Sequence, residues 1–154
     1  MKKQKKQAKK KGSAYGVFRK ILIFWTLFIG IGALAGGLSM IADPSGKFLH
    51  MDGMLPYFRA LPFSDVLFRN FLFPGFALLI VNGLPNFIAA LLLFKKKRTG
   101  VILGGFAGII LMLWICIQFY MFPMNFMSTA FFVFGFLQAV TGYAALRLLG
   151  RREK

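Results

Sequence analysis

Charged side chains are missing from most of this chain, and those that occur are mostly basic. Only 4 of the 154 residues are Asp or Glu, whereas 20 are Lys or Arg, and residues 101–146 carry no charge at all. Ionisable residues inside membrane spans are typical of proton pumps, proton-coupled carriers and voltage sensors. The apolar stretches of this chain contain none, which argues against these three classes.

Features of common catalytic sites are also missing. Cys116 is the only cysteine, so no disulfide can form within the chain. There is no phosphate-binding loop, no H-E-x-x-H, no C-x-x-C and no nucleophile elbow. Asp43, His50, Asp52 and Asp65 share one predicted loop, but their spacings match no metal-binding motif. We therefore predict no catalytic residue, no metal and no cofactor, although an interfacial enzyme that uses this loop remains an alternative.

Long apolar runs dominate the sequence that remains. Hydrophobic residues make up 58% of the chain and charged residues 16%, whereas a soluble domain is about half apolar and about a quarter charged. About 20 consecutive apolar residues are needed to cross the hydrocarbon layer as a helix. The sequence predicts an all-α integral membrane four-helix bundle within residues 19–150, with spans at about residues 21–42, 71–94, 101–122 and 126–146.

The segments outside the spans are predicted from their composition. Residues 1–18 are rich in Lys and Gln, which predicts a disordered basic tail, and residues 151–154 form a second basic end. Residues 43–70 mix charges with Phe, Met and Leu, so we expect an interfacial loop. Within this loop Ser64 is expected to cap a short helix that runs to Asn70.

The basic residues predict the orientation in the membrane. The side with both chain ends and residues 95–98 carries 17 Lys or Arg, and the side with the loop of residues 43–70 carries 3. The positive-inside rule then places both termini in the cytoplasm, most simply of a bacterial plasma (inner) membrane. The net charge of +16 also suits nucleic acid, but its clustering beside apolar runs favours helix orientation. Ala33-Leu34-Ala35 leaves cleavage of residues 1–35 as a signal peptide open.

Small residues recur at four-residue spacing in three of the spans. This spacing places them on one helix face, where a second backbone can approach closely. We expect packing within the bundle, with a homo-oligomer interface as the alternative. The residues are Gly32, Gly36, Gly100, Gly104, Gly108 and Gly135.

Four polar residues lie within the second and fourth spans. Asn82 and Asn86 are one turn apart in the second span, and Gly83 and Pro85 between them predict a kink. Counting from the outer ends of the spans places Asn82 near the depth of Gln138, and Asn86 near that of Thr141. Because an amide in hydrocarbon needs a partner, these residues are expected to form a polar seam between the two helices. The seam has two interpretations: interhelical hydrogen bonding alone, or the floor of a pocket for a lipid-like or quinone-like ligand.

Three sequence pieces, D-P-S-G, P-F-S-D and F-P-G-F-A-L-L-I-V-N-G, carry a resemblance over about residues 30–145. The order of these pieces along the chain resembles that in small four-span bacterial membrane proteins, most of which are uncharacterised. In span number and Gly spacing it is also similar to the DoxX-like class. The resemblance implies a four-helix membrane architecture and transfers no site residue.

Three functions fit these features. The first is a non-enzymatic accessory or structural component with membrane lipids and an unidentified membrane protein partner. The second is a lipid-binding or isoprenoid-quinone-binding protein, and the third is a small transporter or channel subunit. A pocket that opens sideways to lipid favours the second, and a polar path across the bilayer favours the third.

Overall fold

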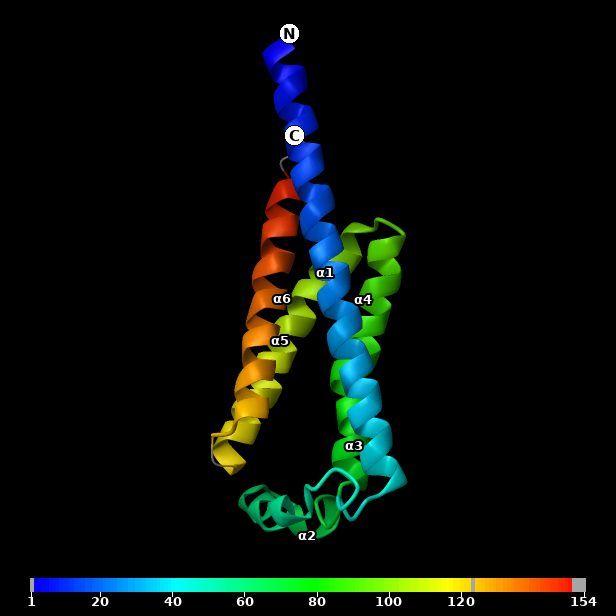
Figure 1. Ribbon diagram of the computed structural model, residues 1–154, viewed down its shortest axis with the longest axis vertical. Helices are drawn as coiled ribbons and strands as arrows, with labels where there is room; N and C mark the ends of the chain where they lie inside the picture. Colours follow the sequence, from blue (N-terminus) through cyan, green and yellow to red (C-terminus); the bar gives the residue numbers. More distant parts are fainter. Residues whose placement is uncertain (1, 123, 151–154) are drawn as a thin grey trace.

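The computed structural model describes residues 2–122 and 124–150, and over these residues it is helical without strands. Four helical stretches are long and apolar enough to span a membrane: Ala14–Ala42, Leu72–Phe94, Arg98–Met121 and Phe126–Gly150. The predicted all-α four-helix fold is confirmed (Figure 1). The elements are α1 (Lys2–Ala42), η1 (Asp52–Ala60), α2 (Ser64–Leu67), α3 (Leu72–Leu78), η2 (Leu79–Gly83), α4 (Leu84–Phe94), α5 (Arg98–Met121) and α6 (Phe126–Gly150).

The first helix is longer than the sequence pattern predicted. We expected residues 1–18 to be disordered, but α1 begins at Lys2 and continues without a break to Ala42. Lys, Gln and Ala are all good helix formers. Because the apolar part of α1 already supplies the helix nucleus, extending it toward the N-terminus adds residues without a new nucleation step.

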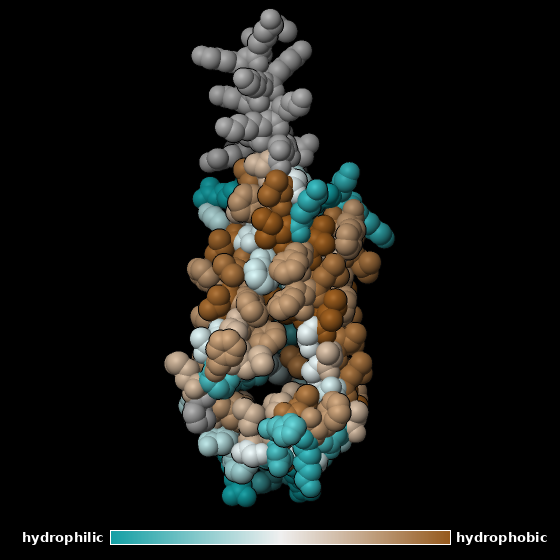
Figure 2. Space-filling model, in the orientation of Figure 1, coloured by the Kyte–Doolittle hydropathy of each residue, from teal (hydrophilic) through white to brown (hydrophobic). Residues whose placement is uncertain are grey.

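The bundle is closed at one end and splayed at the other. Figure 1 shows α1 and α3 diverging from α5 and α6 toward the end that carries η1 and α2, which we call the loop end. The opposite end, which we call the basic end, carries both termini and the turn from α4 to α5. Hydrophilic residues gather at these two ends, and a hydrophobic belt lies between them (Figure 2).

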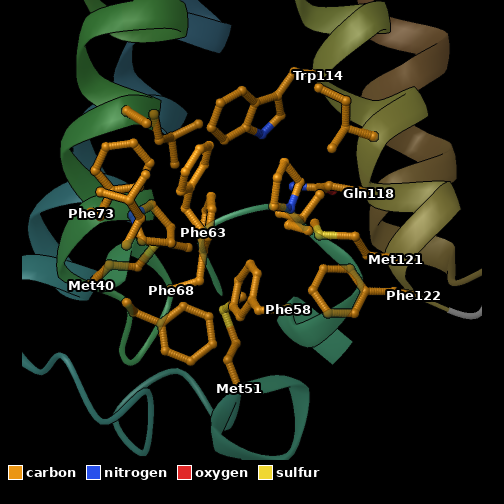
Figure 3. Close-up of a pocket in the computed structure, with 18 residues that line it drawn as sticks. Met40, Met51, Phe58, Phe63, Phe68, Phe73, Trp114, Gln118, Met121 and Phe122 are labelled. Carbon is orange, nitrogen blue, oxygen red and sulfur yellow. The ribbon is translucent and has the colours of Figure 1, made fainter. Parts of the chain in front are cut away.

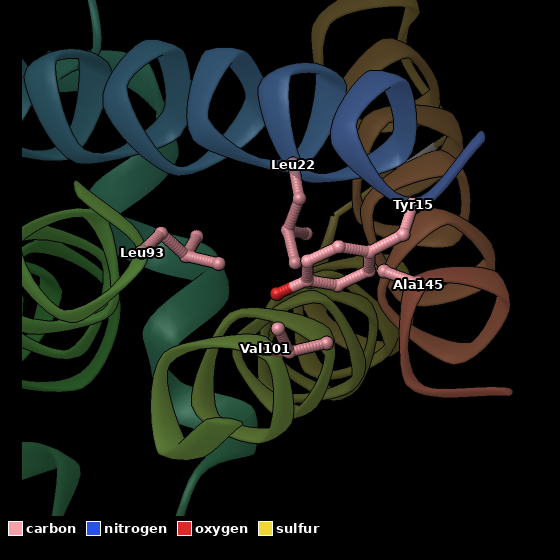
Figure 4. Close-up of a cluster of buried hydrophobic side chains, with 5 residues drawn as sticks. All are labelled: Tyr15, Leu22, Leu93, Val101 and Ala145. Atoms are coloured by element: carbon pink, nitrogen blue, oxygen red, sulfur yellow. The ribbon is translucent and has the colours of Figure 1, made fainter. Parts of the chain in front are cut away.

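A compact apolar cluster closes the basic end. Tyr15 and Leu22 of α1 meet Leu93 of α4, Val101 of α5 and Ala145 of α6, and all five are buried (Figure 4). The cluster brings all four spans together. The hydrophobic core is therefore continuous at this end of the bundle. At the loop end, the loop of residues 43–70 covers the space between the helices.

Glycine pairs set the closest helix contacts. A Cβ added at Gly108 would lie 2.6 Å from the Gly135 carbonyl oxygen, and one at Gly142 would lie 2.4 Å from the Gly105 Cα. Of the six glycines predicted for packing, three have such crowded surroundings: Gly100, Gly108 and Gly135. An added Cβ would lie 3.2 Å from a Leu22 side-chain atom at Gly104 and 3.3 Å from a Leu78 side-chain atom at Gly36, and Gly32 has more room, with its nearest atom 3.8 Å away.

The second span is interrupted by a π-helical turn. In η2 the Leu84 N–H donates to the Leu79 carbonyl, five residues earlier. Pro85 has no N–H to give to the Val81 carbonyl, so the regular pattern has to change here. The predicted kink is thus a π turn one step before Pro85, and it contains Asn82. Such turns often occur at functional sites.

The loop of residues 43–70 folds across the splayed end. Phe58 of η1, Phe71 and Phe122 are buried together, with their rings in edge contact. The predicted cap is wrong, because Ser64 is the first residue of α2, Phe63 occupies the capping position, and α2 ends at Leu67. Positive φ at Phe63 (62°) leaves the chain in a left-handed conformation just before α2.

A hydrogen-bonded turn fixes the start of this loop. The Asp43 carboxylate accepts bonds from the Ser45 hydroxyl at 2.6 Å, the Phe48 N–H at 2.7 Å and the Ser45 N–H at 3.1 Å. These bonds, led by that from the Ser45 hydroxyl, hold the pKa of Asp43 below its usual range. Because the folded pKa is lowered, this stabilisation is present at neutral pH and is lost only as the pH falls through the lowered value.

The glycine contacts predict a sharp difference between two Gly→Ala variants. Gly142→Ala should destabilise the protein by about 1–3 kcal/mol, because the new methyl group meets the α5 backbone. Gly16→Ala is the control, since nothing lies within 4 Å of its added Cβ, and should be neutral or slightly stabilising. Thermal unfolding in detergent measures both. Equal melting temperatures would contradict this packing.

Candidate functional site

The splayed end encloses a cavity of about 470 Å³, which we call the Asn82 cavity. It lies between α1, η2, α5, α6 and the loop, and Figure 2 shows the surface hollowed just above the loop end. Most of its lining is apolar. Four polar residues also line it: Asn82, Gln118, Asn125 and Ser128.

A second cavity of about 440 Å³, which we call the lateral cavity, adjoins the first. Figure 3 shows Trp114 and Gln118 of α5 facing the aromatic side chains of α3 and the loop across it. Phe73 of α3 and Ile117 of α5 line it and are 40% and 49% exposed. Its lining therefore includes half-exposed apolar side chains of both α3 and α5. Six residues line both cavities: Met40, Met51, Leu78, Trp114, Gln118 and Phe122.

Below the Asn82 cavity, polar side chains tie three helices together. Gln138 Nε2 of α6 donates to Asn86 Oδ1 of α4 at 2.7 Å and to the Gly104 carbonyl of α5 at 2.9 Å. Asn86 Nδ2 donates to the Asn82 backbone carbonyl at 2.7 Å. Both side chains are fully buried. The predicted seam between the second and fourth spans therefore exists at Asn86 and Gln138.

Thr141 takes no part in this interhelical cluster. Its hydroxyl donates to the Leu137 carbonyl of its own helix at 2.6 Å. A Ser or Thr hydroxyl readily satisfies itself on the carbonyl four residues earlier, which removes any need for a partner on another helix. Of the four residues predicted for the seam, Thr141 therefore lies outside it, and Asn82 takes part only through its backbone carbonyl.

The Asn82 side chain is buried without a partner. It is 1% exposed, and neither Nδ2 nor Oδ1 has a hydrogen-bond partner among the described residues. A buried amide left unpaired costs about 1–3 kcal/mol per group. Asn82 is also among the residues that line the Asn82 cavity, and the described residues use neither its NH2 group nor its carbonyl oxygen. Its side chain therefore makes no hydrogen bond to another helix.

A second amide, which was not among the predicted site residues, borders both cavities. Gln118 Oε1 accepts a bond from the Ser128 hydroxyl of α6 at 3.0 Å, and Ser128 is buried. The Gln118 amide N–H groups are thereby left for an acceptor in the cavities. The signal in the sequence is the position of Gln118 and Ser128, on either side of the turn between the last two spans.

Neither cavity is lined by a charged or ionisable side chain among the described residues. Three charged residues of the loop, Arg59, Asp65 and Arg69, line a separate recess. Phe68 is the one residue that lines both this recess and the lateral cavity. No group of three metal-ligating side chains occurs in the described part of the chain.

Methionines form much of the flexible lining. Five of the 8 methionines line one or both cavities. Met is unbranched and polarisable, so it adapts its shape to irregular apolar partners. The five are Met40, Met51, Met54, Met121 and Met127.

No protein-family model, curated protein or solved structure matches the chain. Four spanning helices indicate a multi-pass membrane protein. Any more specific function has to come from the cavities and the polar groups at their floor.

The polar cluster predicts a measurable loss of stability. Gln138→Leu should lower the free energy of unfolding by about 0.6–2 kcal/mol, because Asn86 Oδ1 and the Gly104 carbonyl lose their shared donor. Thr141→Val is the control, since it removes a bond within one helix. Unfolding in mixed detergent measures both variants. A Gln138→Leu protein as stable as Thr141→Val would refute the role of this cluster.

Proposed function

We propose that this multi-pass membrane protein binds a lipid-like molecule, either a membrane lipid or an isoprenoid quinone, in its two joined cavities. The unpaired amide of Asn82, 1% exposed at the floor of a 470 Å³ cavity, is the observation that carries the proposal. Binding sites for small molecules are typically mostly apolar spaces of about 300–1,000 Å³ with a few placed polar groups. Both cavities fit that description.

The two cavities suit the two parts of an amphipathic ligand. The polar head group would lie in the Asn82 cavity, where Asn82 and Gln118 offer hydrogen bonds. The apolar tail would leave through the lateral cavity, between Phe73 and Ile117, into the surrounding hydrocarbon. This route needs no water-filled passage, since a lipid enters sideways from the bilayer.

The orientation belongs to the same proposal. The basic end carries most of the Lys and Arg residues, and by the positive-inside rule it faces the cytoplasm. Both cavities would then lie in the outer half of a bacterial plasma (inner) membrane. The bacterial assignment rests on the architectural resemblance to small four-span and DoxX-like proteins.

The other two functions have less support. A channel or transporter needs a polar path across the bilayer, whereas the described residues close the basic end with the Leu22, Leu93 and Val101 cluster. A purely structural component needs filled helix interfaces, and this bundle is hollow at the loop end. Glycines that would serve a homo-oligomer, such as Gly108 and Gly135, are used inside the chain. An accessory role with a protein partner stands if ligand binding fails.

Tryptophan fluorescence tests the binding. The chain has 2 tryptophans, and Trp114 lines both cavities while Trp25 packs on Phe28 and Phe134. In Trp25→Phe protein, a brominated diacylglycerol at low mole fraction in micelles should quench Trp114 saturably. In Trp114→Phe protein, quenching of Trp25 should stay weak and linear. Linear quenching of both would contradict the proposal.

Asn82→Leu in the Trp25→Phe background separates a ligand site from a structural one. Leu removes the unpaired amide, so the ligand-free protein should unfold at the same or a higher temperature. The saturable quenching of Trp114 should weaken in the same variant. Lower stability would instead mean that Asn82 serves the fold.

A further inference from the structure

The ligand has to be uncharged where it reaches the Asn82 cavity. No charged or ionisable side chain among the described residues lines that cavity, and its lining includes the almost fully buried amide of Asn82. A phosphate or ammonium group moved there would lose its hydration without gaining a counter-ion. A neutral head group loses much less and needs only hydrogen bonds in return.

The Asn82 amide further restricts the head group. Asn82 has an unpaired NH2 donor group and an unpaired acceptor oxygen, whichever way the amide is turned. A hydroxyl both donates and accepts from a single oxygen, whereas a ketone, ester or ether oxygen only accepts. A carbonyl head group would therefore leave Asn82 Oδ1 buried and unsatisfied, which is the costly outcome.

Resting on the proposed function, we infer that the ligand is a neutral lipid alcohol, such as a diacylglycerol or a quinol, whose hydroxyl pairs with Asn82. Gln118 supplies the second contact. Its Oε1 is engaged by Ser128, so its N–H groups face an acceptor, such as an ester carbonyl, on the same ligand. Gln118 borders both cavities, at the place where the head group joins the tail.

Charge elsewhere in the loop supplies the contrast. Arg59 and Arg69 lie around the separate recess, beside Asp65, and Phe68 is the one residue that this recess shares with the lateral cavity. An anionic lipid would be attracted to these guanidinium groups at the surface rather than to Asn82. Anionic and neutral lipids are thus expected to bind at different parts of the protein. The Arg59→Gln and Arg69→Gln variants distinguish the two sites.

Matched lipids test the inference on the otherwise unchanged protein. Trp114 quenching in Trp25→Phe protein would be titrated with three brominated lipids of identical chains: a diacylglycerol, its 3-O-methyl ether and its phosphate, a phosphatidic acid. The diacylglycerol should bind at least about tenfold tighter than either relative, because the ether lacks the donor and the phosphate is charged. Asn82→Leu should remove the preference for the alcohol over the ether.

Each other result has a definite meaning. Equal affinity for the alcohol and the ether would overturn the inference while leaving lipid binding intact. Tighter binding of phosphatidic acid, reduced by Arg59→Gln or Arg69→Gln, would overturn it in favour of the basic recess. Linear quenching by all three lipids and by quinol would remove the proposed function and this inference together.

Discussion

Gln138 holds the bundle together at a depth where hydrogen-bond partners are scarce. Its one side-chain nitrogen binds Asn86 of α4 and the backbone of α5, so three helices meet at a single atom. In hydrocarbon, helices gain little from burying apolar surface against one another, since lipid is as apolar as they are. A polar tie and close backbone contact are what remain to fix their positions, and this chain uses both.

The hollow loop end follows from where these contacts lie. The Gly105–Gly142 and Gly108–Gly135 contacts hold α5 against α6, and Gly37 meets Gly75 where α1 packs on α3. Between these two helix pairs, the described residues of the loop end make no comparable glycine contact, and the space is bordered by Gly32, Gly36 and long flexible methionines. The π turn at η2 sets Asn82 at the lower edge of that space, with its backbone carbonyl used by Asn86 and its side chain free. Three helices are thus tied by polar atoms, and the Asn82 amide one turn away has no partner among the described residues.

Sequence patterns predicted the four spans, because span length is a local property. They also predicted a polar contact between the second and fourth spans, but depth counting paired Asn82 with Gln138, whereas the structure pairs Gln138 with Asn86, one turn further along. The patterns missed features that depend on how helices rotate and cross. These are the Gly37–Gly75 and Gly105–Gly142 contacts, and the hydrogen bond of the Thr141 hydroxyl to a carbonyl of its own helix. The cavities were left as one of two alternatives, since a splay between helices has no signature in a single sequence. The composition of residues 1–18, taken alone, predicted disorder. It does not show that α1 begins at Lys2, because the helix there continues from the apolar span that follows.

The most direct measurement is native mass spectrometry of the protein extracted from its own membrane. If the buried, unpaired amide of Asn82 marks a binding site, the spectrum should show a discrete and reproducible adduct with the mass of one neutral lipid. The same adduct should be missing from Asn82→Leu and present in Gly16→Ala protein. A bare monomer, or one that carries only a random mixture of phospholipids, would contradict a lipid-binding role.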